Sequence, residues 1–135
     1  MFERVDHLGI AVDELDGAVE RYRDSFDMDL LHREVLPAQG VEAALMGAGD
    51  DRIELLAPLA PDTPVGRFLA RRGPGVHHVA YRVADIDATL ATLAQRQVEL
   101  IDVAARPGLR DSRVAFVHPR ATGGVLTELV EAARG

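Results

Sequence analysis

The sequence predicts an α+β fold in which two βαβββ modules pair within one domain of 135 residues. The first observation is an internal repeat, in which VDHLGIAVDELD at residues 5–16 aligns with VHHVAYRVADID at residues 76–87. The second is that each copy continues with the same order of helical and strand patterns. Neither half could bury its sheet alone, so we expect one domain with modules at about 3–60 and about 75–132.

The first module begins with a strand followed by an amphipathic helix. Alternation over residues 5–12 predicts a strand on which His7 and Ile10 lie on opposite faces. Apolar residues at helical spacing over 15–26 predict a one-sided helix with Asp13 as its N-cap. The remaining strands of this module are expected at 30–35, 41–46 and 52–56.

The second module repeats this order. Its first strand, residues 76–83, places His78 where the first module has His7. A helix over 86–94 follows, and Asp85 is its expected N-cap. Further strands are expected at 98–103, 114–117 and 125–130.

A short helix is expected to link the modules within residues 61–75. Thr63 can cap it, Pro64 suits its first position and Gly73 ends it. We interpret the basic pair Arg71 and Arg72 as the C-terminal end of this helix.

Composition narrows the chemistry that the chain can use. The sequence contains no cysteine and no lysine, so all 15 basic residues are arginine. Disulfides, thiolate nucleophiles, Cys-ligated zinc and Schiff bases are therefore excluded. Catalysis must depend on His, Asp, Glu, Ser, Thr, Tyr or Arg.

The net charge and the hydropathy pattern indicate which classes of ligand and partner to expect. Because the net charge is −7 and only 4% of residues are aromatic, we expect a small-molecule ligand and no nucleic acid. No apolar run approaches the ~20 residues of a membrane span, and no secretory pattern opens the sequence. We therefore expect no membrane partner and a cytoplasmic location.

Four residues related by the repeat suggest a metal site. Glu54 in RIELL and Glu128 in LTELV hold matching places on the last strands, as His7 and His78 do on the first strands. A single His or Glu on a strand is usually a hydrogen-bonded or surface residue, whereas four in symmetric places indicate a shared cleft. Two imidazoles and two carboxylates suit a divalent first-row ion. Co²⁺ is our first choice, with Mn²⁺, Ni²⁺, Zn²⁺ and Fe²⁺ as alternatives.

The other histidines are interpreted as structural. His77 faces away from His78 by strand alternation. His32 and His118 have no symmetric counterpart, and His118 precedes Pro119 at a turn.

Several motifs together resemble the methylmalonyl-CoA epimerase family of the vicinal oxygen chelate superfamily, which has a glyoxalase- and bleomycin-resistance-like fold. They are DHLGIAV, REVLPAQGV, RIELLAPL, GVHHVAYRV and FVHPRATGGVLTELVE, and they cover nearly the whole chain. The resemblance implies a homodimeric isomerase that interconverts (2R)- and (2S)-methylmalonyl-CoA through a metal-stabilised enediolate. It also implies that the metal ligands are His7, Glu54, His78 and Glu128.

The resemblance assigns further roles. It places Gln39 and Ser112 near the substrate carboxylate and Arg120 near the coenzyme A phosphates. For the mechanism, we expect Glu128 to carry the α-proton. Some relatives have a second catalytic Glu where this chain has Ala43, so Glu42 or a bound water is a weak candidate for the second proton carrier. An ordinary solvent-exposed carboxylate is the alternative interpretation of Glu42. Arginines that could also meet the phosphates are Arg106, Arg110 and Arg113.

Other activities fit the same fold. A glyoxalase I-like lyase could use the same four ligands, and an extradiol dioxygenase would need two His and one carboxylate. A non-catalytic small-molecule-binding protein of this superfamily would need no metal. These alternatives stay open on the sequence alone.

Overall fold

The computed structural model describes residues 1–134, and the chain divides into two compact units. One unit is residues 7–77, and the other joins residues 1–6 to the chain from residue 78 onward. The N-terminal residues join the latter unit because Glu3 N–H donates to Arg82 O at 2.8 Å and Asp6 accepts from the Arg82 guanidinium at 2.6 Å.

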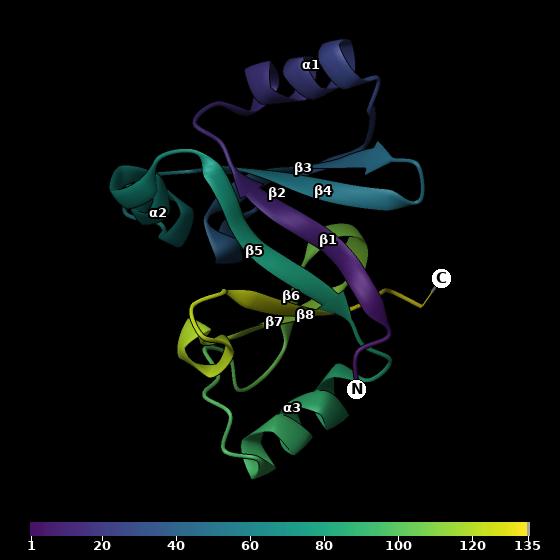
Figure 1. Ribbon diagram of the computed structural model, residues 1–135, viewed down its shortest axis with the longest axis vertical. Coiled ribbons are helices and arrows are strands. Elements are labelled where there is room, and N and C mark those ends of the chain that lie inside the picture. Colours follow the sequence, from purple (N-terminus) through teal and green to yellow (C-terminus); the bar gives the residue numbers. More distant parts are fainter. Residues whose placement is uncertain (135) are drawn as a thin grey trace. The chain divides into compact units, whose positions relative to one another are not determined.

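The secondary structure follows the predicted order. In the first half of the chain the elements are β1 (Arg4–Ala11), α1 (Leu15–Phe26), β2 (Asp29–Leu36), η1 (Pro37–Gln39), β3 (Val41–Ala48), β4 (Asp51–Pro58) and α2 (Pro64–Arg72). In the second half they are β5 (Gly75–Arg82), α3 (Ile86–Gln95), β6 (Arg106–Pro107), η2 (Leu109–Asp111), β7 (Arg113–Val117), η3 (Pro119–Thr122) and β8 (Thr127–Glu131). The strand order is β2-β3-β4-β1-β5-β8-β7-β6 (Figure 1). The predicted α+β class with two βαβββ modules is confirmed.

The two modules share one strand register, which positions the candidate site. In the first, β1 and β4 are parallel and Gly9 is the partner of Glu54. In the second, β5 and β8 are parallel and Ala80 is the partner of Glu128. Each histidine of the repeat therefore lies two residues before the partner of its glutamate. Because side chains alternate along a strand, each His lies on the same face as the corresponding Glu.

On the opposite face of each half-sheet, one helix covers a cluster of apolar side chains. Helix α1 buries Leu15, Ala18 and Val19 against strands β3 and β4 (Figure 1). Helix α3 buries Ile86, Leu90 and Leu93 against β7 and β8. Burial of a Leu or Ile side chain contributes about 1.5–3 kcal/mol. This packing therefore fixes which strand residues are left for the other face.

The N-cap of α1 differs from the prediction. Glu14, and not Asp13, caps the helix, because its carboxylate accepts the backbone N–H groups of Asp16 at 2.9 Å and Gly17 at 2.8 Å. The side chain can fold back because Gly17 has no Cβ, which would lie 2.8 Å from the Glu14 Oε2 atom. The predicted Asp85 cap of α3 is confirmed by its bond from Ala88 N–H at 3.0 Å.

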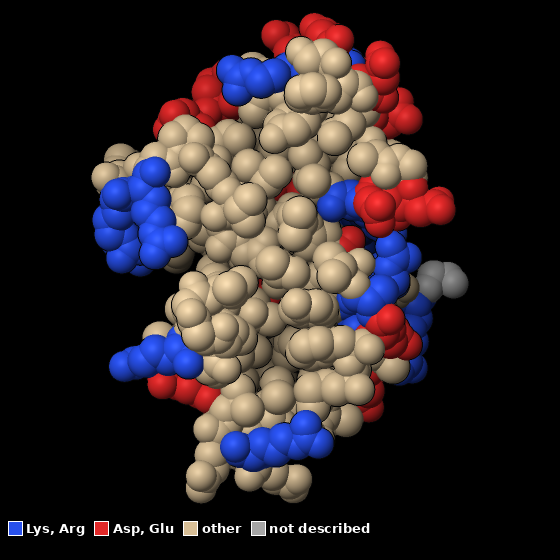
Figure 2. All heavy atoms as spheres, viewed as in Figure 1, with Lys and Arg blue, Asp and Glu red and all other residues tan. Residues whose placement is uncertain are grey.

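Helix α2 matches the predicted linking helix. The Thr63 hydroxyl accepts from Gly66 N–H at 3.1 Å, Pro64 is the first helical residue, and Gly73 ends the helix at a φ of 74°. Arg71 and Arg72 lie in its last turn, where the basic surface over α2 is visible in Figure 2. Cations there complement the negative end of the helix dipole.

The strand predicted at residues 98–103 is wrong. There, only Leu100 forms an isolated bridge, to Val117. The next residues cannot continue the ladder, because the N–H groups of Ile101 and Asp102 both donate to Phe116 O and the Asp102 carboxylate accepts Phe116 N–H at 2.8 Å. A side chain that replaces the backbone as acceptor ends regular pairing.

Residues 1–134 include no helix that combines the length and the apolar character of a transmembrane span.

The assignment of Glu14 as the N-cap of α1 can be tested by mutation. Glu14→Ala should lower the free energy of unfolding by about 1 kcal/mol, because two backbone donors lose their acceptor. Asp13→Ala should change it by less than about 0.5 kcal/mol, as expected of a surface position. Urea unfolding followed by circular dichroism measures both, and an equal loss in the two variants would contradict this assignment.

Candidate metal centre

Four ionisable side chains of the repeat are buried. Their residues are exposed by only 5% for His7, 5% for Glu54, 2% for His78 and 3% for Glu128. Burying a charged group is costly unless the group is paired or binds a metal. These side chains therefore need compensating contacts, which the shared register supplies.

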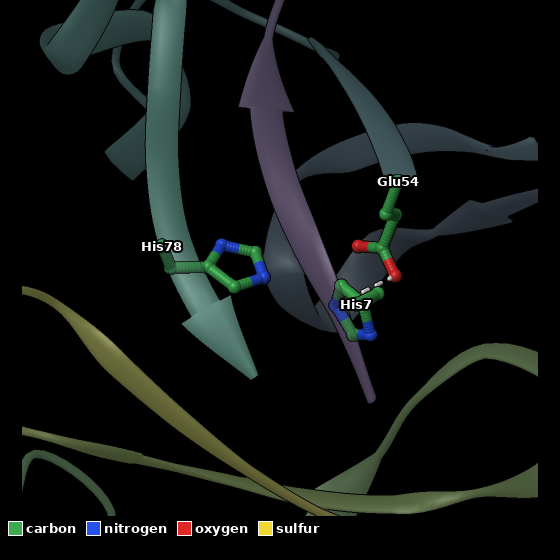
Figure 3. Close-up of side chains that lie close together, drawn as sticks. All are labelled: His7, Glu54 and His78. Atoms are coloured by element: carbon green, nitrogen blue, oxygen red, sulfur yellow. Dashed lines mark ion pairs between the residues drawn. The ribbon is translucent and has the colours of Figure 1, made fainter. Parts of the chain in front are cut away.

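In the unit of residues 7–77, β1 and β4 hold the first pair. His7 Nε2 lies 3.4 Å from Glu54 Oε2 (Figure 3). This distance is longer than a typical N–H···O hydrogen bond of about 2.9 Å. The imidazole and the carboxylate thus face each other at close range.

In the other unit, β5 and β8 hold the second pair. His78 Nε2 lies 3.6 Å from Glu128 Oε1. The His78 ring meets Phe116 of β7 edge to face, with centroids 5.5 Å apart and an angle of 90° between the ring planes. Phe116 is also the β7 partner of Glu128, and the Arg106 guanidinium lies 5.6 Å from its ring centroid. The aromatic ring thereby fixes the orientation of the imidazole.

Three of the predicted ligands form a group with metal-binding geometry. His7, Glu54 and His78 each offer one ligand atom, and these atoms lie within 4.8 Å of one another (Figure 3). Two imidazole nitrogens and a carboxylate oxygen suit a divalent first-row ion. The fourth predicted ligand, Glu128, is placed by its contact with His78. The donor types and their burial thus fit a divalent cation.

The structure places Glu42 on the wrong face for the role considered for it. On β3, Glu42 is the partner of Ala57, whereas Leu45, three residues later, is the partner of Glu54. Positions three apart on a strand lie on opposite faces. The Glu42 carboxylate is instead bound by Arg33 at 3.0 Å, and Arg33 also contacts Asp16 at 2.6 Å. These two carboxylates raise the pKa of Arg33, and the hydrogen bond to Glu42 is the larger cause.

The residues assigned to substrate lie in turns. Gln39 is the last residue of η1, and Ser112 follows η2 and donates its backbone N–H to Leu109 O. Arg120 lies in η3, where its guanidinium bonds Glu99 at 3.0 Å and its side chain is 75% exposed. All three are near the surface, where a substrate could reach them.

Two further arginines have defined partners. Arg113 binds Asp87 of α3 through two hydrogen bonds of 2.9 and 2.8 Å, which hold the pKa of Asp87 below its ordinary value. Arg113 thus ties α3 to β7 on the helix-covered side of its half-sheet. Arg106 is the β6 partner of Val114 and lies on the face of Phe116.

The remaining histidines differ in their surroundings. His77 packs edge-on against Phe68 of α2 with centroids 5.0 Å apart, and His118 caps η3 by accepting Arg120 N–H. Both fit the structural roles predicted for them. His32, also interpreted as structural, instead faces Glu34, with Nε2 2.8 Å from Oε1. The sequence reasoning did not identify Glu34, although its alternation with His32 in LHREV was visible.

Residues 6–116 match the Glyoxalase/Bleomycin resistance protein/Dioxygenase superfamily. The chain belongs to this superfamily.

Among superfamily structures, the fold is similar to methylmalonyl-CoA epimerase from Mycobacterium tuberculosis, with a TM-score of 0.95 and 42% identity, covering 98% of this chain and 90% of that one. A methylmalonyl-CoA epimerase in complex with methylmalonyl-CoA and NH4+ has a TM-score of 0.93 and 40% identity, with coverage of 98% and 96%. The mitochondrial methylmalonyl-CoA epimerase of Mus musculus is 34% identical over 96% of this chain and 73% of its own length. The resemblance predicted from the motifs is confirmed.

The metal centre can be tested without substrate. His78→Ala should weaken Co²⁺ binding by at least about 100-fold, since loss of even a supporting residue costs 10–100-fold. Calorimetric titration measures the affinity, and Co²⁺ at 100 times its Kd should raise the stability of the unaltered protein by about 2.7 kcal/mol.

The matched control is His77→Ala, which removes the neighbouring imidazole on the opposite face of β5. Its Co²⁺ affinity should equal that of the unaltered protein. Equal weakening in the two variants would contradict the assignment of His78 as a ligand.

Proposed function

We propose that the chain is a metal-dependent isomerase that interconverts (2R)- and (2S)-methylmalonyl-CoA. The observation that carries the proposal is the duplicated, buried His–Glu pair, His7 with Glu54 and His78 with Glu128. A superfamily member 40% identical to this chain has been solved with methylmalonyl-CoA, which supports a coenzyme A thioester as the substrate.

The metal proposal assigns four ligands to one divalent ion. They are His7, Glu54, His78 and Glu128, of which the first three already group their ligand atoms within 4.8 Å. Co²⁺ is the first choice, with Mn²⁺, Ni²⁺, Zn²⁺ and Fe²⁺ as alternatives. When bound, such an ion supplies Lewis-acid stabilisation of a developing oxyanion, which contributes several kcal/mol.

In this proposal Glu128 moves the α-proton. The α C–H bond breaks and the proton passes to a Glu128 carboxylate oxygen. The electron pair of that bond forms a double bond to the thioester carbonyl carbon, and the carbonyl π pair moves onto its oxygen to give an enediolate. A proton then returns to the opposite side of the planar carbon, and this return inverts the centre. Glu128 suits the role because it is a buried carboxylate beside His78 in the candidate metal centre.

Three polar residues are proposed to bind the rest of the substrate. Gln39 and Ser112 would hold the free carboxylate by hydrogen bonds, and Arg120 would meet the coenzyme A phosphates through its exposed guanidinium. For Arg120 this requires that phosphate replace Glu99 as the partner. A homodimer and a cytoplasmic location remain predictions of the sequence analysis.

Solvent exchange tests the activity. The Co²⁺-loaded protein should epimerise methylmalonyl-CoA in D₂O and exchange the α-proton. Glu128→Gln should lower the epimerisation rate by at least about 100-fold, the lower end of the general acid–base contribution. NMR of the α-proton and chiral chromatography give both rates.

The control is Glu20→Gln, the same substitution at an exposed position of α1. It should leave both rates unchanged. A lyase or a ligand-binding protein would show no epimerisation in any variant, which would overturn the proposed function. Near-normal epimerisation by Glu128→Gln would refute only the role of Glu128.

A further inference from the structure

Epimerisation requires a second proton carrier, because the proton leaves one side of a planar carbon and returns to the other. Glu42 lies on the helix-covered face and is bound by Arg33. We propose that Glu34 of β2, positioned by His32, is this second carrier. The inference rests on the proposed epimerase function.

Strand register places the His32–Glu34 pair on the face of the candidate metal centre. Leu45 of β3 is the partner of Glu54 on one side and of His32 on the other. Directly opposed residues of antiparallel strands project on the same side of the sheet. His32 therefore shares a face with Glu54.

Glu34 lies in the next row of this face. Its β3 partner is Ala43, two residues before Leu45 and so on the same side of the strand. Ala43 is fully buried, and its β4 partner is Leu56. The side chain of Ala43 is only a methyl group. This short side chain does not stand between the Glu34 carboxylate of the neighbouring strand and this face of the sheet.

The other carboxylates of strands β1–β4 are less suited. Besides Glu54, only Glu34 and Asp29 fall on this face by register, and Asp29 is exposed at the first residue of β2. The carboxylates on the opposite face are Asp6, Glu42 and Asp51. Glu34 is partly buried, with 35% of its side chain exposed.

The distances suit a bound thioester. Two strand spacings and two residues of rise separate the Cα atoms of Glu34 and Glu54 by about 12 Å. Both side chains project from the same face of the sheet, so their carboxyl groups can contact different ends of one small acyl group. A substrate anchored beside Glu54 would then present its α-carbon to Glu34.

His32 holds the Glu34 carboxylate in place. Its Nε2 atom is 2.8 Å from Glu34 Oε1, a strong hydrogen bond, and the two side chains are exposed to the same degree. In one direction, the Glu34 carboxylic acid gives its proton to the α-carbon as the new C–H bond forms, and the enediolate electron pair becomes that bond. The carboxylate left behind keeps the His32 hydrogen bond. In the other direction, Glu34 removes the proton.

Exchange measured separately on each epimer tests the proposal. Co²⁺-loaded Glu34→Gln should epimerise at least about 100-fold more slowly than the unaltered protein. It should still exchange the α-proton of one epimer for deuterium from D₂O, since Glu128 removes the proton on that side of the α-carbon. Exchange from the other epimer should be lost. A merely structural defect would lower exchange from both epimers together.

Three comparisons complete the test. Glu42→Gln, the same change on the opposite face of the next strand, should keep both exchanges. Glu34→Asp, which retains a carboxyl group, should recover part of the lost exchange. Co²⁺ affinity without substrate should be unchanged in Glu34→Gln, as expected of a residue that is not a ligand.

Two results would overturn the inference while the proposed function stands. One is epimerisation by Glu34→Gln within about threefold of the unaltered protein. The other is equal loss of exchange from both epimers in Glu34→Gln and Glu34→Asp. If the unaltered protein exchanges neither epimer, the proposed function fails and this inference fails with it.

Discussion

Two glutamates and two histidines of the repeat are buried in this chain, and each of these carboxylates lies 3.4–3.6 Å from an imidazole. Burial of such groups is tolerated only with strong compensation, so their positions constrain the strands that carry them. The constraint is met twice by the same device, a parallel strand pair with the His two residues before the partner of the Glu. The opposite strand faces are then left apolar, and α1 and α3 cover them.

The repeat allowed much of this to be predicted from the sequence. Strand alternation has a period of two, so the matching places of the His on the first strand and the Glu on the last strand of each copy pair His7 with Glu54 and His78 with Glu128, although the turns between them differ in length. The helices were predicted because their apolar residues recur at helical spacing and their far sides are polar. The family resemblance, confirmed by the comparisons, agrees with these assignments.

The errors have local physical causes that the pattern does not contain. Asp13 is a better N-cap by residue type than Glu14, but Gly17 lets the longer side chain fold back onto two N–H groups. The Asp102 carboxylate replaces a backbone acceptor and ends a strand that hydropathy favours. The face on which His32 and Glu34 lie could not be read from β2, because a bulge between Leu30 and His32 separates them from the alternation of the strand's first residues, and only the pairing with β3 reveals it.

The central claim is that both histidines of the repeat bind one cation together. X-ray absorption at the cobalt K-edge of the Co²⁺-loaded protein tests it most directly, since imidazole rings give a distinct multiple-scattering pattern. The account predicts a nitrogen and oxygen shell with two imidazoles, and one imidazole after His7→Ala. A shell without imidazole, or one that His7→Ala leaves unchanged, would contradict it.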